Sequence, residues 1–396
     1  MVGTQARRVL IAGGGIGGLA AALALQHRGF DPIVFERSET LRDGGAGLHI
    51  WTNGTLILDQ LGVADEVLKI APAQEICRFA SSRGEVFGAW DVGSFTAKYG
   101  RPTIAVERSI LHRALREALS GNVVRTGAEV VAFEQNDTGV TVRLADGSTE
   151  TGDVLIGADG INSTVRIGLH GAEKPRYNGY IAWRGKAALT HDLIPPGTFH
   201  ALFGPGTRFT YYDVAPGVVH WMSVANGPAG GANEPDMKAL LAERHRGWVD
   251  PVSEILAATP ESDIIRSDVY DRRPSKKRWG RDRATLLGDA AHPITFNIGQ
   301  GACQALEDAS ILAEELAATP DVPSALRLYE QQRIPRTAAM QRTAWLIGQM
   351  GAVENPALIQ LRQLVMRLAW PKFAFTAAER DQISYAARWA TVPTAP

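Results

Sequence analysis

The sequence predicts an α/β protein in which a Rossmann-like dinucleotide-binding domain carries an inserted, mostly antiparallel β-sheet domain and ends in C-terminal helices. Three observations lead to this prediction. A glycine-rich βαβ pattern opens the chain, and short alternating or aromatic strands fill its middle. Two amphipathic stretches follow residue 334, with a break expected near Asn355-Pro356. With 396 residues, the chain is long enough for two domains.

The composition argues against several other classes of protein. A formal net charge of −1 favours neither a nucleic-acid partner nor an anionic membrane. Cys77 and Cys303 lie far apart, which argues against a disulfide scaffold and a zinc finger. No two histidines are closer than nine residues, so we expect no metal site. Because no apolar run of about 20 residues indicates a membrane span, we expect a soluble, cytoplasmic protein.

The first phosphate site lies in the stretch "RRVLIAGGGIGGLAAALALQHRGFDPIVFERSE". An apolar strand over 9–12, an Ala/Leu-rich helix over 19–27 and a second strand over 32–36 are expected. Between the first strand and the helix, Gly13, Gly15 and Gly18 have the GxGxxG spacing. These glycines allow a tight turn, close approach of a pyrophosphate, and close packing of helix on strand.

Glu36 closes the second strand, about 20 residues after the glycines. There its carboxylate can accept a hydrogen bond from a ribose hydroxyl. The same negative charge disfavours a 2′-phosphate. We therefore expect FAD or NAD, and not NADP, as the resident dinucleotide.

Two later strands also end in an acidic residue beside a glycine. The strand over 154–158 runs into Asp159-Gly160, and the strand over 284–287 runs into Gly288-Asp289. Such carboxylates face the crevice in which open α/β sheets bind ligands. A simpler interpretation of the first is a turn whose Asn162 or Ser163 caps a helix. Three strand ends of this kind favour one extended cofactor, since an NAD-only enzyme has no evident use for the last.

These motifs, with "GAGLHIWTNG", "ERSILHRAL", "YNGYIAWRG" and "YEQQRIPR", resemble those of the class A flavin-dependent monooxygenases. This family contains the single-component hydroxylases of the p-hydroxybenzoate and salicylate hydroxylase type. The resemblance runs in order over about residues 5–345. It implies one FAD held at both ends, with NADPH or NADH as a transient reductant, since no second GxGxxG is present.

The resemblance also implies roles for individual residues. Arg108 would lie near the flavin, Asp289 at the ribityl chain, and Asp159 with Arg166 at FAD and the transient nicotinamide. The whole predicted cofactor-binding set is Gly13, Gly15, Ile16, Gly17, Gly18, Glu36, Arg37, Gly47, Arg108, Asp159, Gly160, Arg166, Gly288, Asp289, Gly299, Gln300 and Gly301. The amides at the helix start near Gly299 suit the negative charge of a reduced flavin.

The resemblance implies the reaction as well: NAD(P)H reduces the flavin, O₂ adds at C4a, and the hydroperoxide passes one oxygen atom to an electron-rich small molecule. The expected substrate is aromatic or polycyclic, because the middle strands supply an aromatic wall. No catalytic residue is firmly predicted. The candidates are Tyr211, His200, Trp221 and Phe296, the last standing where the family usually has proline. His292 is more simply explained as a structural loop residue.

The predicted domains alternate along the chain. A Rossmann-like FAD-binding domain is expected in three segments, 1–75, 101–170 and 281–335. Substrate-domain strands are expected over 76–100 and 171–280, and a helical layer over 336–396. Three alternatives remain at this stage: epoxidation of an alkene or polyene, a non-oxygenating flavoprotein, and an ordinary NAD dehydrogenase. A halogenase is disfavoured because the Trp-x-Trp-x-Ile-Pro segment is missing. We expect a monomer or homodimer.

Overall fold

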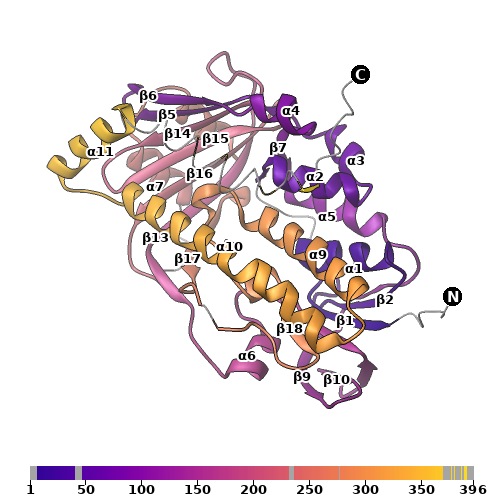
Figure 1. Cartoon of the computed structure of the whole chain (residues 1–396). Coiled ribbons are helices and arrows are strands. Elements are labelled where there is room, and N and C mark those ends of the chain that lie inside the picture. The colour runs from indigo at the N-terminus through magenta and orange to yellow at the C-terminus, as the bar shows by residue number, and fades with distance from the viewer. Residues whose placement is uncertain are drawn as a thin grey trace, which may run out of the picture.

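The computed structural model describes residues 7–40, 47–231, 236–275 and 277–368, together with Thr376, Glu379, Tyr385, Arg388 and Trp389. A parallel sheet with its helices forms one part of the molecule, and an antiparallel sheet forms a second part (Figure 1). A long helix near the C-terminus crosses from one part to the other. The predicted fold class is confirmed.

The parallel sheet has five strands in the spatial order β18, β12, β1, β2, β8. Their bounds are, in that order, Ala284–Leu286, Val154–Gly157, Arg8–Ala12, Asp31–Phe35 and Val124–Arg125. Every neighbouring pair is parallel. The carboxyl ends of all five strands therefore lie at one edge, and the chain order reverses beside β1, which is where such sheets bind ligands.

A seven-stranded sheet has the order β17, β13, β16, β15, β14, β5, β6, and only its β14–β5 pair is parallel. Its bounds are Ile265–Asp271, Arg176–Ala188, Val218–Asn226, Thr207–Ala215, Thr198–Phe203, Ile76–Ser81 and Val86–Asp91. Two small antiparallel sheets have the orders β11–β10–β9 and β3–β7–β4. Their bounds are Thr149–Gly152, Val140–Leu144 and Val130–Gln135, and Gly47–Ile50, Thr103–Glu107 and Ala73–Gln74.

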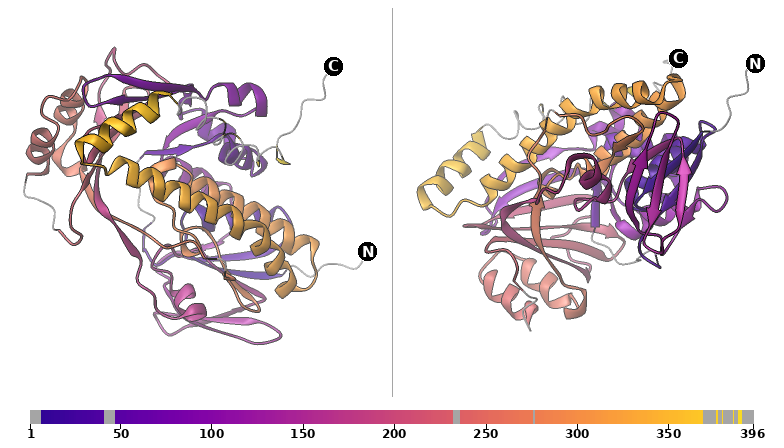
Figure 2. Two further views of the ribbon diagram at one scale, coloured as in Figure 1. Left: turned by 60° about the vertical axis from the view of Figure 1, so that its left-hand side comes forward. Right: turned by 90° about the horizontal axis from the view of Figure 1, so that it is seen from below.

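The helices divide between the two large sheets. Near the parallel sheet are α1 (Ile16–Gln26), α2 (Thr52–Gln60), α3 (Ala64–Leu68), α4 (Ser94–Tyr99), α5 (Arg108–Glu117), α6 (Thr164–His170) and α9 (Gly301–Ala318). The helices α7 (Met237–Arg244) and α8 (Val252–Ala258) cover one face of the seven-stranded sheet (Figure 2). Short 3₁₀ turns lie at Glu261–Asp263, Gly288–Ala290 and Phe296–Ile298.

Two apolar cores correspond to these two parts. The larger core joins β1, β2, β12 and β18 with α1 and α9, whose Ala and Leu side chains are almost fully buried. A second core fills the space between the seven-stranded sheet and the pair α7 and α8. The other face of that sheet turns toward the carboxyl edge of the parallel sheet, since Phe296 packs on it. This face is the one that can meet a bound cofactor.

The C-terminal helices differ from the prediction at one point. The expected break near Asn355-Pro356 is present between α10 (Val322–Gly351) and α11 (Pro356–Leu368). However, α10 begins well before residue 334 and continues through Pro335. Ion pairs on both sides of the proline, from Arg333 and Arg336 to Glu307 of α9, hold the helix in place. In the described part of the chain, no helix combines the length and apolarity that a bilayer crossing needs.

Candidate active site

The first phosphate cradle lies between β1 and α1. Gly13 has φ +106°, and a Cβ there would come within 2.4 Å of the Ala158 carbonyl oxygen. A Cβ on Gly18 would come within 2.0 Å of the Gly13 carbonyl oxygen, so Gly18 is the position at which helix meets strand. A Cβ on Gly15 would have no other atom within 4 Å. Gly13 and Gly18 are therefore required by packing, and Gly15 leaves room for a ligand.

The remaining predicted residues of this cradle act through their backbone. Ile16 is buried, and a Cβ on Gly17 would meet Leu287 at 2.7 Å, so both are packing positions. Among the described residues, no side chain caps the N-terminus of α1. Its first amides can therefore donate to a phosphate.

Glu36 is held as a carboxylate at the end of β2. Its Oε2 accepts from the Gly14 amide at 2.8 Å, and its Oε1 accepts from the Ser38 amide at 2.9 Å. Burial raises the pKa of Glu36, but these backbone hydrogen bonds outweigh burial and hold the pKa below its ordinary value. The neighbouring Arg37 is exposed. Glu36 thus remains ionised at neutral pH and keeps lone pairs for a ribose hydroxyl.

Sequence reasoning missed His112, which completes this cradle. Its Nε2 lies 2.7 Å from the Gly14 carbonyl oxygen, which fixes the glycine turn from the side of α5. The signal for it was present in "ERSILHRAL", where a histidine follows Arg108 at i+4 and so lies on the same helix face.

At the end of β12, Asp159 is primarily a cap of α6. Its Oδ2 accepts from the Thr164 and Val165 amides, and Ser163 Oγ accepts from the Arg166 amide at 2.8 Å. Ser163 is therefore a helix cap, which was the simpler interpretation of this segment. Yet Asp159 Oδ1 is buried without a hydrogen-bond partner in the described residues, and burial raises the pKa of this carboxyl. An orphaned oxygen of this kind is suited to a hydroxyl donor of a ligand.

Arg166 and Gly160 complete this strand end. The Arg166 guanidinium reaches the carbonyl oxygens of Ala290 and Ala291 at 3.3 and 3.4 Å, so it ties α6 to the loop after β18. Gly160 has φ +81° and open space at its Cβ position. Within the described structure, Arg166 thus holds the loop that carries Asp289.

Asp289 lies at the end of β18, in the turn Gly288–Ala290. Many protein atoms surround this residue, but its side chain is exposed to solvent. Burial raises its pKa, and the charges of His292 and Arg108 partly oppose this. Arg108, the first residue of α5, is therefore near enough to Asp289 for its charge to act on that carboxyl.

The start of α9 belongs to the helix that packs against this turn. Gly299 has φ +64°, and a Cβ there would come within 2.9 Å of the Trp51 indole nitrogen, which itself donates to the Ile298 carbonyl. A Cβ on Gly301 would meet nothing within 4 Å. Where the chain is described, no side chain caps α9. Like those of α1, its first amides therefore have no side-chain acceptor among the described residues and could donate to a ligand.

A buried ionic network stands behind this helix start. In α9, Glu307 Oε1 accepts from Asn53 at 2.7 Å, and Asn53 also donates to Gln300 Oε1 at 3.0 Å. Asp308 Oδ2 accepts from the Gly288 amide at 2.9 Å and lies 2.5 Å from His292 Nε2. His292 is therefore a structural residue, as its simpler interpretation held.

Arg333 of α10 neutralises both carboxylates of the network. Its Nη1 lies 2.5 Å from Glu307 Oε2, and its Nε lies 2.6 Å from Asp308 Oδ1, with all three side chains fully buried. Burial raises the pKa of Asp308, but His292 and Arg333 outweigh it and hold that pKa at about 2. Burial also raises the pKa of Glu307, and Arg333 with Arg336 reverses this. Sequence reasoning placed none of these ion pairs.

Gly47 is packed against a histidine from the seven-stranded sheet. Its amide donates to His220 Nδ1 at 3.1 Å, and a Cβ there would come within 2.6 Å of the ring. Burial lowers the pKa of His220 to about 3 and that of nearby His49 to about 4. Both rings are therefore neutral at neutral pH and offer the site no positive charge.

Three catalytic candidates lie on the face of the seven-stranded sheet that α7 and α8 cover. Trp221 donates to Thr259 Oγ1 and packs in the core beneath α7 and α8, Tyr211 is its cross-strand partner, and His200 stacks on Tyr211 with ring centroids 4.5 Å apart. Alternation assigned residues to two faces, but it did not tell which face α7 and α8 cover. Tyr211, His200 and Trp221 therefore do not share a face with Phe296, and their catalytic role stays a prediction.

Phe296, by contrast, lies on the face toward the cofactor edge. It packs with Tyr180, Met222 and Val224, and the Arg208 guanidinium lies 5.2 Å from the Tyr180 ring and 5.9 Å from the Phe296 ring. Arg208 is 6% exposed, and its Nη2 has no hydrogen-bond partner within the described residues. Sequence reasoning missed Arg208, although its alternation with Phe209 placed it on this face.

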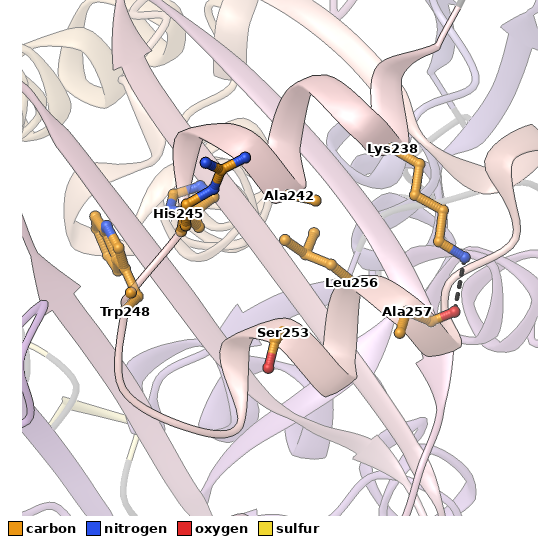
Figure 3. Close-up of a pocket in the computed structure, with 9 residues that line it drawn as sticks. Lys238, Ala242, His245, Trp248, Ser253, Leu256 and Ala257 are labelled. Atoms are coloured by element: carbon orange, nitrogen blue, oxygen red, sulfur yellow. Dashed lines mark hydrogen bonds between the residues drawn. The ribbon is translucent and has the colours of Figure 1, made fainter.

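A separate groove lies between α7 and α8 (Figure 3). It has a volume of about 400 Å³ and is lined by Lys238, Ala242, His245, Arg246, Gly247, Trp248, Ser253, Leu256 and Ala257. Lys238 donates to the Ala257 carbonyl across its end (Figure 3). Because the sheet separates it from Phe296, this groove takes no part in the site described here.

The geometry thus places two helix starts without side-chain caps, α1 and α9, and the carboxylates of Glu36 and Asp289 at strand ends of one α/β fold, as the described residues show. The chain also matches the family model described as an FAD binding domain over residues 6–183 and 252–344. It belongs to the FAD-dependent monooxygenases, and FAD is its cofactor. Open space at Gly15, the orphaned Asp159 oxygen and the accessible Asp289 carboxyl all fit that group.

Relatives with names in this class support the assignment. The aurachin C monooxygenase/isomerase of Stigmatella aurantiaca is 39% identical over 362 residues, which is 91% of this chain and 94% of that protein. The chloroplastic zeaxanthin epoxidase of Nicotiana plumbaginifolia is 36% identical over 87% of this chain, which spans only 55% of that protein. The structure of Klebsiella pneumoniae HpxO with FAD and uric acid is 29% identical, with a TM-score of 0.87 and 98% coverage of each chain.

A pair of glycine variants separates ligand space from packing in the first cradle. Gly15→Ala should leave the stability of the apoprotein within about 1 kcal/mol of wild type and weaken FAD binding at least about 10-fold, since the added Cβ enters the ligand's space. Gly18→Ala should destabilise the fold by about 1–3 kcal/mol or more, because its Cβ meets backbone. Urea unfolding measures the change in stability, and fluorescence titration with FAD measures the change in affinity. If both variants lost stability and FAD affinity to the same extent, Gly15 would not be the position that leaves room for the ligand.

The ionic network predicts a pH-dependent effect of Arg333→Met. The lowered pKa values of Asp308 and Glu307 stabilise the native state above about pH 4, and this stability is lost as pH falls toward 2. Without Arg333, burial raises both pKa values, so the variant should lose about 3–5 kcal/mol near pH 7.

That difference should narrow as the buried carboxyls protonate toward pH 4, which urea unfolding at several pH values measures. Arg125→Met, which breaks the more exposed Arg125–Glu150 pair, should cost less than about 1 kcal/mol. If the difference in unfolding free energy between Arg333→Met and wild type stayed constant with pH, Arg333 would not be neutralising Asp308 and Glu307.

Proposed function

We propose that this protein is an NAD(P)H- and O₂-dependent monooxygenase that hydroxylates an aromatic or polycyclic small molecule. The observation that carries the proposal is the wall formed by Tyr180, Phe296 and Arg208. This wall continues directly into the start of α9, because Phe296 lies only five residues before Gly301. A planar ring held on the wall would therefore lie next to the helix start that suits the flavin's pyrimidine edge.

Arg208 is the polar group that would orient the substrate. Arg208 has no acidic partner among the described residues. A buried guanidinium of this kind is costly, and an anionic or carbonyl oxygen of a ligand would relieve that cost. Burial already lowers the pKa of Arg208. Stacked on two rings, the guanidinium is held in one plane, so it can direct one edge of an aromatic ligand.

The other residues of the site would bind, orient and exclude water. Bound FAD supplies the redox and oxygen-transfer chemistry. Asp159, Glu36 and Asp289 would accept hydrogen bonds from cofactor hydroxyls, and the amides of α1 and α9 would donate to its phosphate and ring oxygens. Met222, Val224 and Phe296 form an apolar lining that would keep water from the oxygen-transfer step.

Phe296 replaces the proline usual at this position in the resembling hydroxylases, and it retains a main-chain carbonyl. In the turn Phe296–Ile298 that carbonyl accepts from the Gly299 amide at 3.0 Å. It therefore closes the turn before α9, and its ring, rather than a rigid proline ring, contacts the substrate wall. We propose Phe296 as a substrate-contacting residue on this basis.

Epoxidation of an alkene is the second candidate function. The similarity to a zeaxanthin epoxidase over 87% of this chain favours it. The apolar wall beside Phe296 would equally accept an extended alkene. Product structure separates the two reactions, since an arene gains a hydroxyl group and an alkene gains an oxirane.

The test of the main proposal is NADH and NADPH consumption over a panel of phenols, aromatic acids, polycyclic aromatics and polyenes. A substrate should accelerate cofactor oxidation severalfold and yield a product heavier by one oxygen atom. Mass spectrometry identifies that product, and a peroxide assay measures uncoupled turnover. A panel that gives hydrogen peroxide alone would contradict a hydroxylase.

The role of Arg208 is tested by Arg208→Met once a substrate with an acidic or carbonyl oxygen is known. Its KM should rise about 10-fold or more, equivalent to about 1.4 kcal/mol, while FAD content stays unchanged. Arg244→Met is a matched control, because Arg244 stacks on Trp183 on the opposite face of the sheet at 5.1 Å. If the two variants had equal KM values, Arg208 would not contact the substrate.

A further inference from the structure

The helix α11 presents an apolar stripe to solvent. Leu358 is 52% exposed, Leu361 55%, Val365 42% and Leu368 73%. The adjacent Leu364 is 52% exposed. Figures 1 and 2 show α11 at the outer edge of the molecule, beyond the end of α10 and far from α1 and α9.

The opposite side of α11 is anchored, so the direction of the stripe is fixed. Met366 is 2% exposed and Arg362 is 5% exposed. Arg362 donates to the carbonyl oxygens of Met350 and Gly204, at 3.2 and 3.3 Å. A helix held from one side by a buried arginine cannot simply rotate its leucines inward. The apolar stripe therefore belongs to the folded state.

The spacing of the stripe is that of a helix-pairing seam. Leu358, Leu361, Val365 and Leu368 follow one another at intervals of three, four and three residues, which is the a/d pattern of a heptad repeat. In this register Val365 is at position a and two leucines are at position d. A β-branched residue at a with leucine at d favours two-stranded packing.

The size of the stripe also suits a protein partner. Its five side chains leave on the order of 500 Å² of apolar surface in water, at the upper end of what a monomer usually exposes in one patch. Two such surfaces, with a polar rim, approach the total of about 1,200 Å² or more that stable interfaces bury.

The charges around the stripe argue against a lipid surface as its partner. Helices that lie on membranes carry an excess of Lys and Arg beside the apolar face. Here Arg367 is paired with Glu85, Arg362 is buried, and Glu354 stands just before the helix. The described flanks of α11 therefore carry no excess of positive charge.

We propose that the stripe of α11 pairs with the same stripe of a second copy of this chain, forming a homodimer. A closed twofold contact uses the same surface on both partners, and a four-residue seam on a short helix is suited to such self-pairing. Dimerisation would also hold α11, and with it the 351–355 connection whose Val353 carbonyl accepts from Gly206, close to Arg208.

Sedimentation velocity of the FAD-loaded enzyme over a range of protein concentrations tests the proposal. The wild type should sediment as a dimer at micromolar concentration. Leu361→Glu should sediment as a monomer, with dimer affinity lowered at least about 100-fold, because a carboxylate in the seam would be buried against the partner's leucines. FAD content should not change, since Leu361 is exposed in the single chain.

Leu193→Glu is the matched control, because Leu193 is 49% exposed but lies outside α11. This variant should remain a dimer. A wild-type protein that is monomeric at all concentrations would overturn the proposal, and so would a Leu361→Glu variant that dimerises as well as wild type. A monomer that co-floats with anionic phosphatidylserine vesicles would identify a lipid surface as the partner instead.

Discussion

The burial of two adjacent carboxylates in α9 is the constraint on which the rest of the structure depends. Glu307 and Asp308 are fully buried, and Arg333 contacts both. Unpaired charges in such a place would cost several kcal/mol each. The arginine reaches them because α10 packs along α9, and the helix then continues through Pro335. The long helix is thus fixed by electrostatics as well as by packing.

The same carboxylates connect the loops that face the cofactor. The Asn53 side chain donates hydrogen bonds to Glu307 and to Gln300 at the start of α9. The Gly288 amide, beside Asp289, donates to Asp308. Loops are usually the most mobile parts of a protein. Here the start of α2, the start of α9 and the turn at Gly288 share one buried network, so the first amides of α9 and the Asp289 carboxyl keep a fixed relation. Such fixed donors and acceptors are what electrostatic preorganisation requires.

Much of the cofactor edge could be predicted from the sequence, because parallel strands place their carboxyl ends together whatever lies between them. That rule brought Gly13, Asp159 and Asp289 to one edge. The substrate wall could not be predicted in the same way. Alternation separated Arg208 from Tyr211, but only the position of α7 and α8 decides which face is covered. The partners of Arg333 were equally hidden, since they depend on how α10 crosses α9.

The most direct test of a single FAD held at both ends is competition binding to the apoprotein. FAD should bind with a stoichiometry of one, and ADP alone should displace it. Asp289→Ala should weaken FAD binding at least about 10-fold and leave ADP binding unchanged, because α1 and Glu36 are expected to bind the adenylate. Simultaneous binding of ADP and FAD, or equal loss of both ligands in Asp289→Ala, would contradict the account.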